Sequence, residues 1–436
     1  ERELQRVTPG SVLLDFVDVR RRGGLLTERR NLSYQSTCRL EQNRQGDVIQ
    51  LIGNAGEDDA IHLMIRSDLN LPCSAVPFSQ SYAQAESRWK DWFCGLPRVR
   101  EPYREAYLYA WWIMANNIVS PRGFLRYQAA FPSKAYYLGV WNWDACFHAV
   151  ALRHNDPQLA RDQLRAMIAA QRPNGMIPDV VHDEGIVNWI GHPIPGEVTK
   201  PPVLAWAAVK INEIDPNPDF LAEIYPAIVR WHDWYFSHTD EDSGLAEYTH
   251  PYTSGMDDSP MWDHGFPVIA PDLNTYLYLQ RQALATMAER LGKDAEAERW
   301  RERAAVLLDA IIEHLYDSEA GLFQARHDGE PIPERTIVNL YPLLTEQLPA
   351  EIEKRLVEHL TDAETFWLPH PLATVAANTP SFDADTMMMA TVHRSGEGVR
   401  VAVKGAPEAV LEVSTRIARG DGEAEALSDE ARKGWA

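Results

Sequence analysis

The sequence has few cysteines and no apolar run long enough to cross a bilayer. Its cysteines are Cys38, Cys73, Cys94 and Cys146. They form no C-x-x-C pair and have no His at metal-ligand spacing, so neither a zinc site nor a disulfide framework is indicated. The longest aromatic and apolar patch, 106–115, is too short for a membrane span. We therefore expect reduced thiols, no metal, no cofactor, no membrane partner and a cytoplasmic location.

Basic residues are also scarce, with 42 Lys and Arg against 63 Asp and Glu, a formal charge of −21. This balance repels phosphate backbones and anionic lipid, which argues against nucleic acid and membranes as partners. Aromatic residues are plentiful, with 14 Trp, 16 Tyr and 12 Phe. Flat aromatic faces bind the apolar faces of sugar rings, so we expect a small-molecule carbohydrate as the partner. Nothing in the sequence indicates the oligomeric state.

The length of 436 residues and the hydrophobic content of 45% fit a globular protein of two or three domains. The chain begins at Glu1 with neither Met nor a signal peptide, which is compatible with a fragment of a longer protein.

The pattern of apolar residues changes along the chain. Residues 1–80 alternate short apolar runs with Gly, Asn and Asp turns, which predicts a small N-terminal β-region. Apolar residues at three-to-four spacing then predict helices over 101–117, 157–171, 202–212, 220–238, 273–291, 295–315 and 351–360. Long loops rich in aromatic and acidic residues join them, at 130–144, 174–200 and 244–272. A helical toroid or solenoid with catalytic loops fits this pattern better than a four-helix bundle.

Near residue 386 the pattern changes again. Residues 387–393, a turn at 395–398 and residues 399–403 predict a β-hairpin. Pro407 stands where a helix would start, and 408–418 is helix-like. Residues from Gly420 onward are charged and are expected to be loosely ordered.

The most informative segment is Ser-Gly-Met-Asp-Asp-Ser at 254–259, which places carboxylates on a Gly-bent loop. A carboxyl that is partly desolvated by aromatic neighbours keeps its proton near neutral pH and can act as a general acid. The expected neighbours of Asp257 are Tyr248, His250, Tyr252, Met256 and Trp262. The same residue types also form ordinary acidic turns, so the segment alone leaves both interpretations open.

Four segments together carry a resemblance. They are Tyr-Leu-Gly-Val-Trp-Asn-Trp-Asp at 137–144, Gln-Arg-Pro-Asn-Gly-Met-Ile-Pro-Asp at 171–179, Thr-Lys-Pro-Pro at 199–202, and His-Pro-Tyr-Thr at 250–253 leading into the acidic loop. In this order they resemble glycoside hydrolase family 63, in particular its bacterial branch of mannosylglycerate hydrolases and α-glucosidases, and more distantly the trehalases. The resemblance covers roughly residues 80–385.

This resemblance implies an (α/α)6 toroid with the active site at its axis, and a glycosidase that inverts the anomeric carbon with a general acid and a general base. Asp257 matches the acid in the family's S-G-x-D motif. Tyr137, Trp141 and Asp144 match positions that hold the sugar, Trp141 as a stacking wall and Asp144 as hydroxyl acceptor. We also expect Trp262 and Lys200 to line the substrate site.

Other interpretations of these residues stay open. Trp141 and Trp143 also fit core aromatics at a helix start, and Asp144 fits a helix N-terminal charge. Asn174-Gly175 is a turn, so Asp179 could only brace the rim. Lys200 departs from the family, which usually has Gln before the paired prolines. A Lys there adds charge to a sugar subsite and leaves the substrate preference open.

A larger departure follows residue 385. The run at 371–385 resembles the one that leads into the family's Tyr-Trp-Arg-Gly-Pro loop, but this loop does not follow. Instead, 387–394 and the Lys-Gly-Ala-Pro-Glu motif at 404–408 resemble the nucleotide-binding domain of P-type cation-transporting ATPases, whose motif Lys lies against the adenosine of ATP. We therefore divide the chain into a β-region (1–80), a toroid incomplete at its C-terminal end (81–385), and an ATPase-like fragment (386–436).

The general base of the resembled family comes after the loop that does not follow here. The chain is therefore expected to carry the acid and part of the sugar site, with little or no turnover. The alternatives are a non-catalytic sugar-binding toroid and a nucleotide-binding module around Lys404. Ion transport is excluded because the aspartyl-phosphate motif and membrane helices of such pumps are absent from this sequence, and Lys404 alone is not expected to hold ATP.

Overall fold

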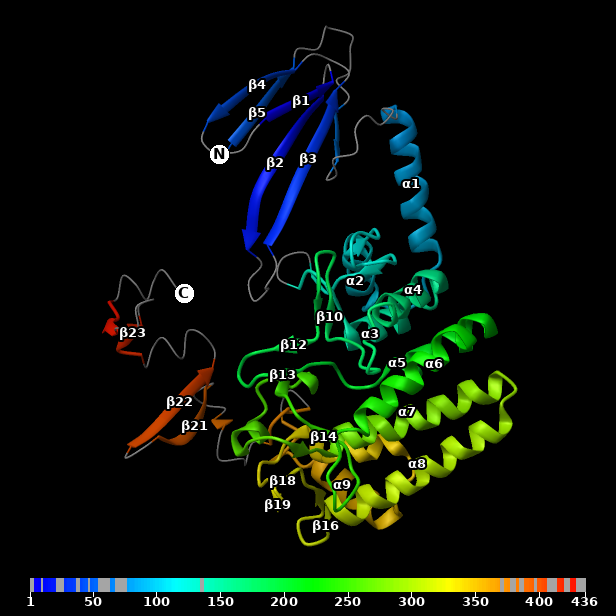
Figure 1. Ribbon diagram of the computed structural model, residues 1–436, viewed down its shortest axis with the longest axis vertical. Helices are drawn as coiled ribbons and strands as arrows, with labels where there is room; N and C mark the ends of the chain where they lie inside the picture. The colour runs from blue at the N-terminus through cyan, green and yellow to red at the C-terminus, as the bar shows by residue number, and fades with distance from the viewer. Residues whose placement is uncertain are drawn as a thin grey trace.

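The N-terminal part of the chain is a set of antiparallel strands. The computed structural model describes residues 77–133, 137–368 and 372–376, and outside them the strands named below with residues 414–415 and 427–428. Four strands form a sheet in the order β1-β2-β3-β6: β1 Leu4–Thr8, β2 Ser11–Arg20, β3 Thr27–Ser36 and β6 Leu63–Arg66. β4 Leu40–Gln45 pairs with β5 Val48–Gly53. The predicted β-region is thus confirmed, and it lies at one end of the molecule (Figure 1).

The rest of the described chain is mainly helical. The α-helices are α1 Phe78–Cys94, α2 Arg104–Asn116, α3 Asn142–Leu152, α4 Pro157–Ile168, α5 Leu204–Ile214, α6 Pro218–Tyr235, α7 Pro271–Arg290, α8 Asp294–Leu315 and α9 Ala350–Thr361. Three 3-10 helices are η1 Pro251–Thr253, η2 Pro260–His264 and η3 Ile337–Thr345. Each of the seven helices predicted from spacing is present, whereas α1 and α3 were not predicted. α1 has apolar residues at helical spacing, Phe78, Tyr82, Ala85 and Trp89, but it crosses the predicted domain boundary at residue 80 and buries no residue.

The core lies between the helices of residues 142–315. In α6, Asn217 accepts a hydrogen bond from the backbone of Phe220 at 2.9 Å and Pro218 occupies the first turn, which starts the helix. α7 is buried on almost every side and packs beside α8 (Figure 1). α8 buries a single stripe: Ala297, Trp300, Ala304, Leu307, Leu308, Ile311 and Leu315. α7 is therefore a central helix, and α8 covers it from outside.

Short strands fix the long loops. β9 Val140–Trp141, β10 Val180–Val181 and β11 Ile186–Val187 form one small sheet. A second joins β14 Glu247–Tyr248, β15 Val268–Ile269, β18 Arg326–His327 and β19 Glu330–Pro331. The remaining pairs are β7 Ile118–Val119 with β8 Ala129–Ala130, β12 Trp189–Ile190 with β13 Gly196–Glu197, and β16 Tyr316–Asp317 with β17 Leu322–Phe323. The loops expected to carry the chemistry are thus ordered by backbone pairing.

The C-terminal hairpin is confirmed, but part of the following helix is not. β20 Phe382–Asp383, β21 Met388–Ser395 and β22 Gly398–Gly405 form a three-stranded sheet. The end of the predicted helix, however, is β23 Arg416–Ala418, which pairs with β24 Ala424–Ala426. Thr415 and Ile417 are β-branched at alternate positions, a pattern that favours a strand once a partner strand is present. The other residues of the predicted helix, 406–413, lie outside the described part of the chain.

No helix in the described residues is both long enough and apolar enough to span a membrane.

Candidate functional site

The site begins where β9 runs into α3. The backbone N–H of Asn142 donates to the carbonyl of Asp179 at 2.9 Å, and the Asn142 side-chain amide donates to the carbonyl of Pro178 at 3.2 Å. Because β9 also pairs with β10, the loop that ends at Asp179 is held beside the start of α3. This places Asp144, in the first turn of α3, close to Asp179.

Asp144 is half-buried. Burial raises the pKa of its carboxyl, and His148, one turn further along α3, and Lys200 oppose the rise. Its position in the first turn agrees with a helix N-terminal charge. It also lies within electrostatic reach of the other charged residues of the site, so both interpretations of Asp144 fit the structure.

Asp144, Asp179, Lys200 and Asp257 form what we call the charged group. Asp179 is its buried member, with 4% of its surface exposed. Its Oδ1 lies 3.3 Å from the Nζ of Lys200, which is equally buried. Burial raises the pKa of Asp179 to about 6; Lys200 opposes this rise, and Asp257 and Asp144 add to it. Asp179 thus pairs with Lys200 while two further carboxyls lie within electrostatic reach of it, and burial keeps its pKa above the ordinary value.

The loop that carries Asp257 is packed against protein through its backbone. Gly255 has a φ of +72°, and a Cβ at this position would lie 2.2 Å from the Trp143 ring. Only Gly fits there. The N–H of Met256 donates to the Ser254 hydroxyl at 2.8 Å, and the carbonyl of Met256 accepts from the Trp262 indole at 2.8 Å.

Asp257 itself is exposed, as is Asp258. The desolvation that we expected around the acid is therefore not found, because the loop buries its backbone and not this carboxyl. Tyr248 and His250 are indeed buried, but the Tyr248 hydroxyl donates to Asp272 at 3.0 Å. Asp257 remains within electrostatic reach of Asp179 and of Tyr252, whose pKa is raised by burial and by the Asp257 and Asp258 charges.

Aromatic rings stand beside the charged group. The rings of Tyr137 and Trp141 meet edge to face with centroids 5.3 Å apart, and Trp141 meets His182 in the same way at 5.8 Å. Tyr137 is 58% exposed and Trp141 is half-buried. The exposed surface of these rings could stack on a sugar. Their substrate role stays a prediction.

Trp262 supports the loop that carries Asp257, residues 252–259, which we call the acid loop. Besides its hydrogen bond to Met256, its ring stacks on Phe266 with centroids 5.2 Å apart and meets Tyr248 edge to face at 5.6 Å. Because its N–H is already used, any contact of Trp262 with a sugar would come from the ring.

Sequence reasoning gave Asp179 only a bracing role and did not single out Trp143 as a support for the loop. The signal for Asp179 was the polar residue that ends the 171–179 segment, but its pairing with Lys200 is visible only in three dimensions. Lys404 lies on β22, in register with Met389 of β21, and its side chain is not among those described. In the described residues, no group of His, Cys, Asp and Glu side chains could hold a metal ion.

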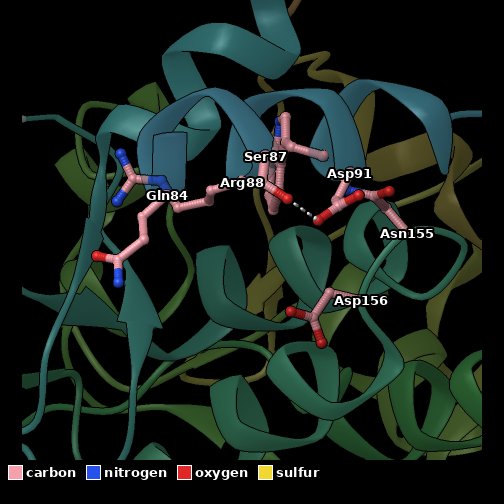
Figure 2. A pocket seen from close by; sticks show the side chains of 7 residues that line it. Gln84, Ser87, Arg88, Asp91, Asn155 and Asp156 are labelled. Carbon is pink, nitrogen blue, oxygen red and sulfur yellow. Dashed lines mark hydrogen bonds between the residues drawn. The ribbon is translucent and has the colours of Figure 1, made fainter. Parts of the chain in front are cut away.

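A pocket of about 500 Å³ lies between α1 and the start of α4 (Figure 2). Ser87 and Asp91 are hydrogen-bonded in it at 3.4 Å, with Arg88, Asn155 and Asp156 nearby. This pocket follows the C-terminal end of α3, whereas the charged group lies at the N-terminal end. It is therefore separate from the candidate site.

Two family models match this chain. A family model described as the mannosylglycerate hydrolase MGH1-like glycoside hydrolase domain matches residues 137–391. This match covers more than half of the 436 residues. A second family model, the cytoplasmic domain N of P-type ATPases, matches residues 375–436.

Individual relatives are similar over a shorter part. Mannosylglycerate hydrolase MGH1 of Selaginella moellendorffii is 29% identical over 157 residues, which cover 32% of this chain and 32% of that protein. Glucosylglycerate hydrolase of Mycolicibacterium hassiacum is 29% identical over 161 residues, covering 31% of this chain and 36% of that protein. The aligned part thus spans about a third of the length of these relatives.

Among solved structures, the GH63 mannosylglycerate hydrolase from Thermus thermophilus in complex with glucose is similar, with a TM-score of 0.52. It is 22% identical, and the match covers 62% of this chain and 80% of that chain. At this identity the likeness shows the fold, a mainly helical α/α toroid, as expected from the sequence.

Proposed function

Because the chain belongs to the MGH1-like glycoside hydrolase family, we propose that it acts on the α-glycosidic bond of a small α-glucoside or α-mannoside and inverts the anomeric carbon. The proposed general acid is Asp257. The relatives named above are hydrolases of mannosylglycerate and glucosylglycerate, so these two compounds are the first substrates to consider.

One observation carries this proposal: Asp257, on a loop, and Asp144, in the first turn of α3, both act electrostatically on the buried Asp179. Carboxylates repel each other, so a fold that brings three of them within electrostatic reach retains this cost for a purpose other than stability. Proton transfer to a glycosidic oxygen is a chemistry that uses such a group.

In the proposed complex the sugar ring lies between Asp144 and the Tyr137–Trp141 rings. Asp144 accepts hydrogen bonds from sugar hydroxyls, and the indole of Trp141 covers an apolar face of the ring. Asp257, at the exposed end of the acid loop, reaches the bond to the leaving group.

Inversion requires a second carboxylate roughly 6.5–9.5 Å from the acid to activate water. Asp179 is poorly suited to this role, because it is almost fully buried and its carboxylate is paired with Lys200. We propose that the chain is weakly active, because the general base expected from the family resemblance is not among Asp144, Asp179 and Asp257.

The test is an assay of the full chain with mannosylglycerate, glucosylglycerate and aryl α-glycosides, with NMR detection of the first anomer released. We expect slow turnover with inversion, and Asp257→Asn should abolish it. Asp258→Asn is the matched control, because it removes the neighbouring exposed carboxyl and should leave turnover nearly unchanged. Turnover that survives Asp257→Asn would contradict the assignment.

A second candidate is a toroid that binds sugar without hydrolysing it. The exposure of Asp257 favours this candidate, since the aromatic enclosure expected of the acid is not formed. Calorimetry with the same sugars distinguishes the two: binding weakened by Asp144→Ala but accompanied by no turnover identifies a binding protein.

The match of residues 375–436 to an ATPase nucleotide-binding domain raises a third candidate. If this segment binds nucleotide, ATP should protect Lys404 from amine-reactive labelling, whereas Lys210 should stay equally reactive. Equal labelling of Lys404 with and without ATP would remove this candidate.

A further inference from the structure

Lys200 contacts two segments of the site that are far apart in the sequence, the one that ends at Asp179 and the one that carries Tyr252. Its carbonyl accepts a hydrogen bond from the Tyr235 hydroxyl at 2.7 Å, and the preceding Thr199 donates its hydroxyl to the carbonyl of Ile177 at 2.5 Å. These bonds fix the backbone just before α5. The residue is only 5% exposed, so its ammonium group must find its acceptors inside the protein.

The ammonium group has two partners on two different loops. One is the carboxylate of Asp179, with which it forms an ion pair at 3.3 Å, at the end of the 171–179 segment. The other is the backbone carbonyl of Tyr252 in η1, to which the ammonium donates a hydrogen bond. Tyr252 is five residues before Asp257, on the same loop. One side chain therefore connects the acid loop to the buried carboxylate.

We propose that Lys200 is a positioning residue: it ties the acid loop to Asp179 and thereby fixes where Asp257 stands relative to Asp144. The proposal deepens the function proposed above and rests on it only for the role of Asp257. The link between the loops is a property of the folded chain whether or not it turns over substrate.

The hydrogen bond to the Tyr252 carbonyl gives Lys200 a second contact, on the loop of Asp257, besides the ion pair that compensates Asp179. Whether this contact positions the loop is what the experiment below measures. Two further contacts hold the loop between Tyr252 and Asp257: Gly255 lies on the Trp143 ring, and the Met256 carbonyl accepts from the Trp262 indole. Lys200 thus provides the anchor at the N-terminal start of the loop, at Tyr252.

Charged and titratable groups face Lys200 and Asp179 from each neighbouring element. They are Asp144 of α3, His250 before η1, and Asp257 of the acid loop. Removing the ammonium would leave Asp179 buried among carboxyls without a cation. Its pKa, now about 6, should then rise further.

The experiment compares Lys200→Met and Lys200→Arg, with Lys210→Met as the control. Lys210 lies on α5 and pairs with Glu213 at 3.0 Å at the surface. Two quantities are measured: the titration of the Asp179 carboxyl by NMR, and hydrogen exchange of the backbone amides of 252–257. We expect Lys200→Met to raise the Asp179 titration midpoint by a unit or more and to speed exchange in the loop at least tenfold. Lys200→Arg should largely restore both, and Lys210→Met should change neither.

The double variant Lys200→Met with Asp179→Asn provides the decisive comparison, because it leaves no uncompensated charge and guards against misfolding of the single variant. Positioning by Lys200 predicts that the loop still exchanges fast in this variant. Exchange as slow as in the unmodified chain would overturn the proposal, as would an unshifted Asp179 in folded Lys200→Met. Neither readout uses turnover, so these results can hold even if the activity assay fails.

Discussion

At the scale of single residues, Gly255 shows how closely the acid loop is fitted to the helix beneath it. Its φ of +72° is costly for any residue with a side chain, and the Trp143 ring occupies the place of a Cβ. Gly292 has nearly the same φ, +71°, but open space around it. Substitution of Gly292 therefore measures the free-energy cost of the backbone conformation alone. Substitution of Gly255 adds the cost of steric overlap with Trp143.

We predict that Gly255→Ala destabilises the protein by about 2–4 kcal/mol, the sum of left-handed strain and steric overlap. Gly292→Ala should cost only about 1 kcal/mol, from the backbone alone. Urea unfolding of both variants measures the difference. Equal losses would mean that the loop moves off Trp143 without penalty.

Asp272 is a second residue whose environment leads to a prediction. It is 1% exposed, its carboxylate accepts from the Tyr248 hydroxyl, and burial raises its pKa to about 6. A carboxyl with a raised folded-state pKa adds stability below its ordinary pKa of 3.8, and this stability is lost as the pH rises through about 6.

We therefore expect the free energy of unfolding of Asp272→Asn to increase relative to that of the unmodified chain as the pH rises from 4 to 7.5. The increase should be about 3 kcal/mol, because the pKa of Asp272 is raised by roughly two units on folding. Asp219→Asn is the matched control, because Asp219 also follows a first-turn proline but is exposed. Urea midpoints at both pH values give the answer. A pH-independent effect of Asp272→Asn would contradict the assigned cause.

At the scale of elements, α6 illustrates a helix whose start is written in the sequence. The side chain of Asn217 accepts from the N–H of Phe220, and the Asn217 N–H donates to Asn212 at 2.7 Å. We predict that Asn217→Ala costs about 1 kcal/mol through loss of the cap. Asn217→Asp keeps a capping oxygen and should retain most of the stability. Thermal unfolding of the two variants tests this, and an equal loss in both would show that the cap is not the cause.

The sequence predicted such elements because their signals are local. For α6 the apolar spacing indicated 220–238, and the structure has Pro218–Tyr235. α1 was missed because it begins at Phe78, inside the segment assigned to the β-region, and α3 because its start was assigned to the loop at 130–144. Asp179 was underestimated for a different reason: its partner Lys200 is 21 residues away, and the two segments meet only in the folded chain, where the Thr199 hydroxyl donates to the Ile177 carbonyl.

The turn at 254–259 was predicted correctly, but the burial expected for Asp257 was not found. A turn is predicted here by Ser254, Gly255 and Pro260. The local sequence does not indicate which side of this turn is buried. The structure buries the backbone, so Asp257 is exposed. Whether Asp257 is the catalytic acid, and whether the sugar binds at Tyr137, Trp141 and Asp144, stay predictions.

At the scale of the whole molecule, α1 and α2 present an apolar surface. Tyr82 is 61% exposed, Tyr109 61% and Trp112 46%. Such surfaces promote association, although the net charge of −21 opposes it.

We predict concentration-dependent self-association that grows with salt, since salt screens the repulsion. Replacing both Tyr109 and Trp112 with Lys should shift the equilibrium towards monomer in sedimentation experiments. Val306→Lys is the control, because Val306 is also exposed, at 68%, but lies on α8. Unchanged association of the double variant would place the contact elsewhere.

Two strands pair across the proposed domain boundary at residue 385. The two family matches overlap at residues 375–391. β20, before the boundary, pairs with β21 beyond it, Phe382 opposite Met389 and Asp383 opposite Met388. The backbone pairing therefore crosses the boundary, and the division of the chain into domains stays a prediction.

The buried pair of Lys200 and Asp179 limits how this chain could evolve. Loss of either partner leaves an unpaired charge in the interior, which typically costs about 3–5 kcal/mol and is enough to eliminate most single-step variants. A lineage can exchange this pair for neutral residues only through two nearly simultaneous substitutions or after the surrounding core has become more stable. Lys200 and Asp179 should therefore be inherited together in descendants of this protein.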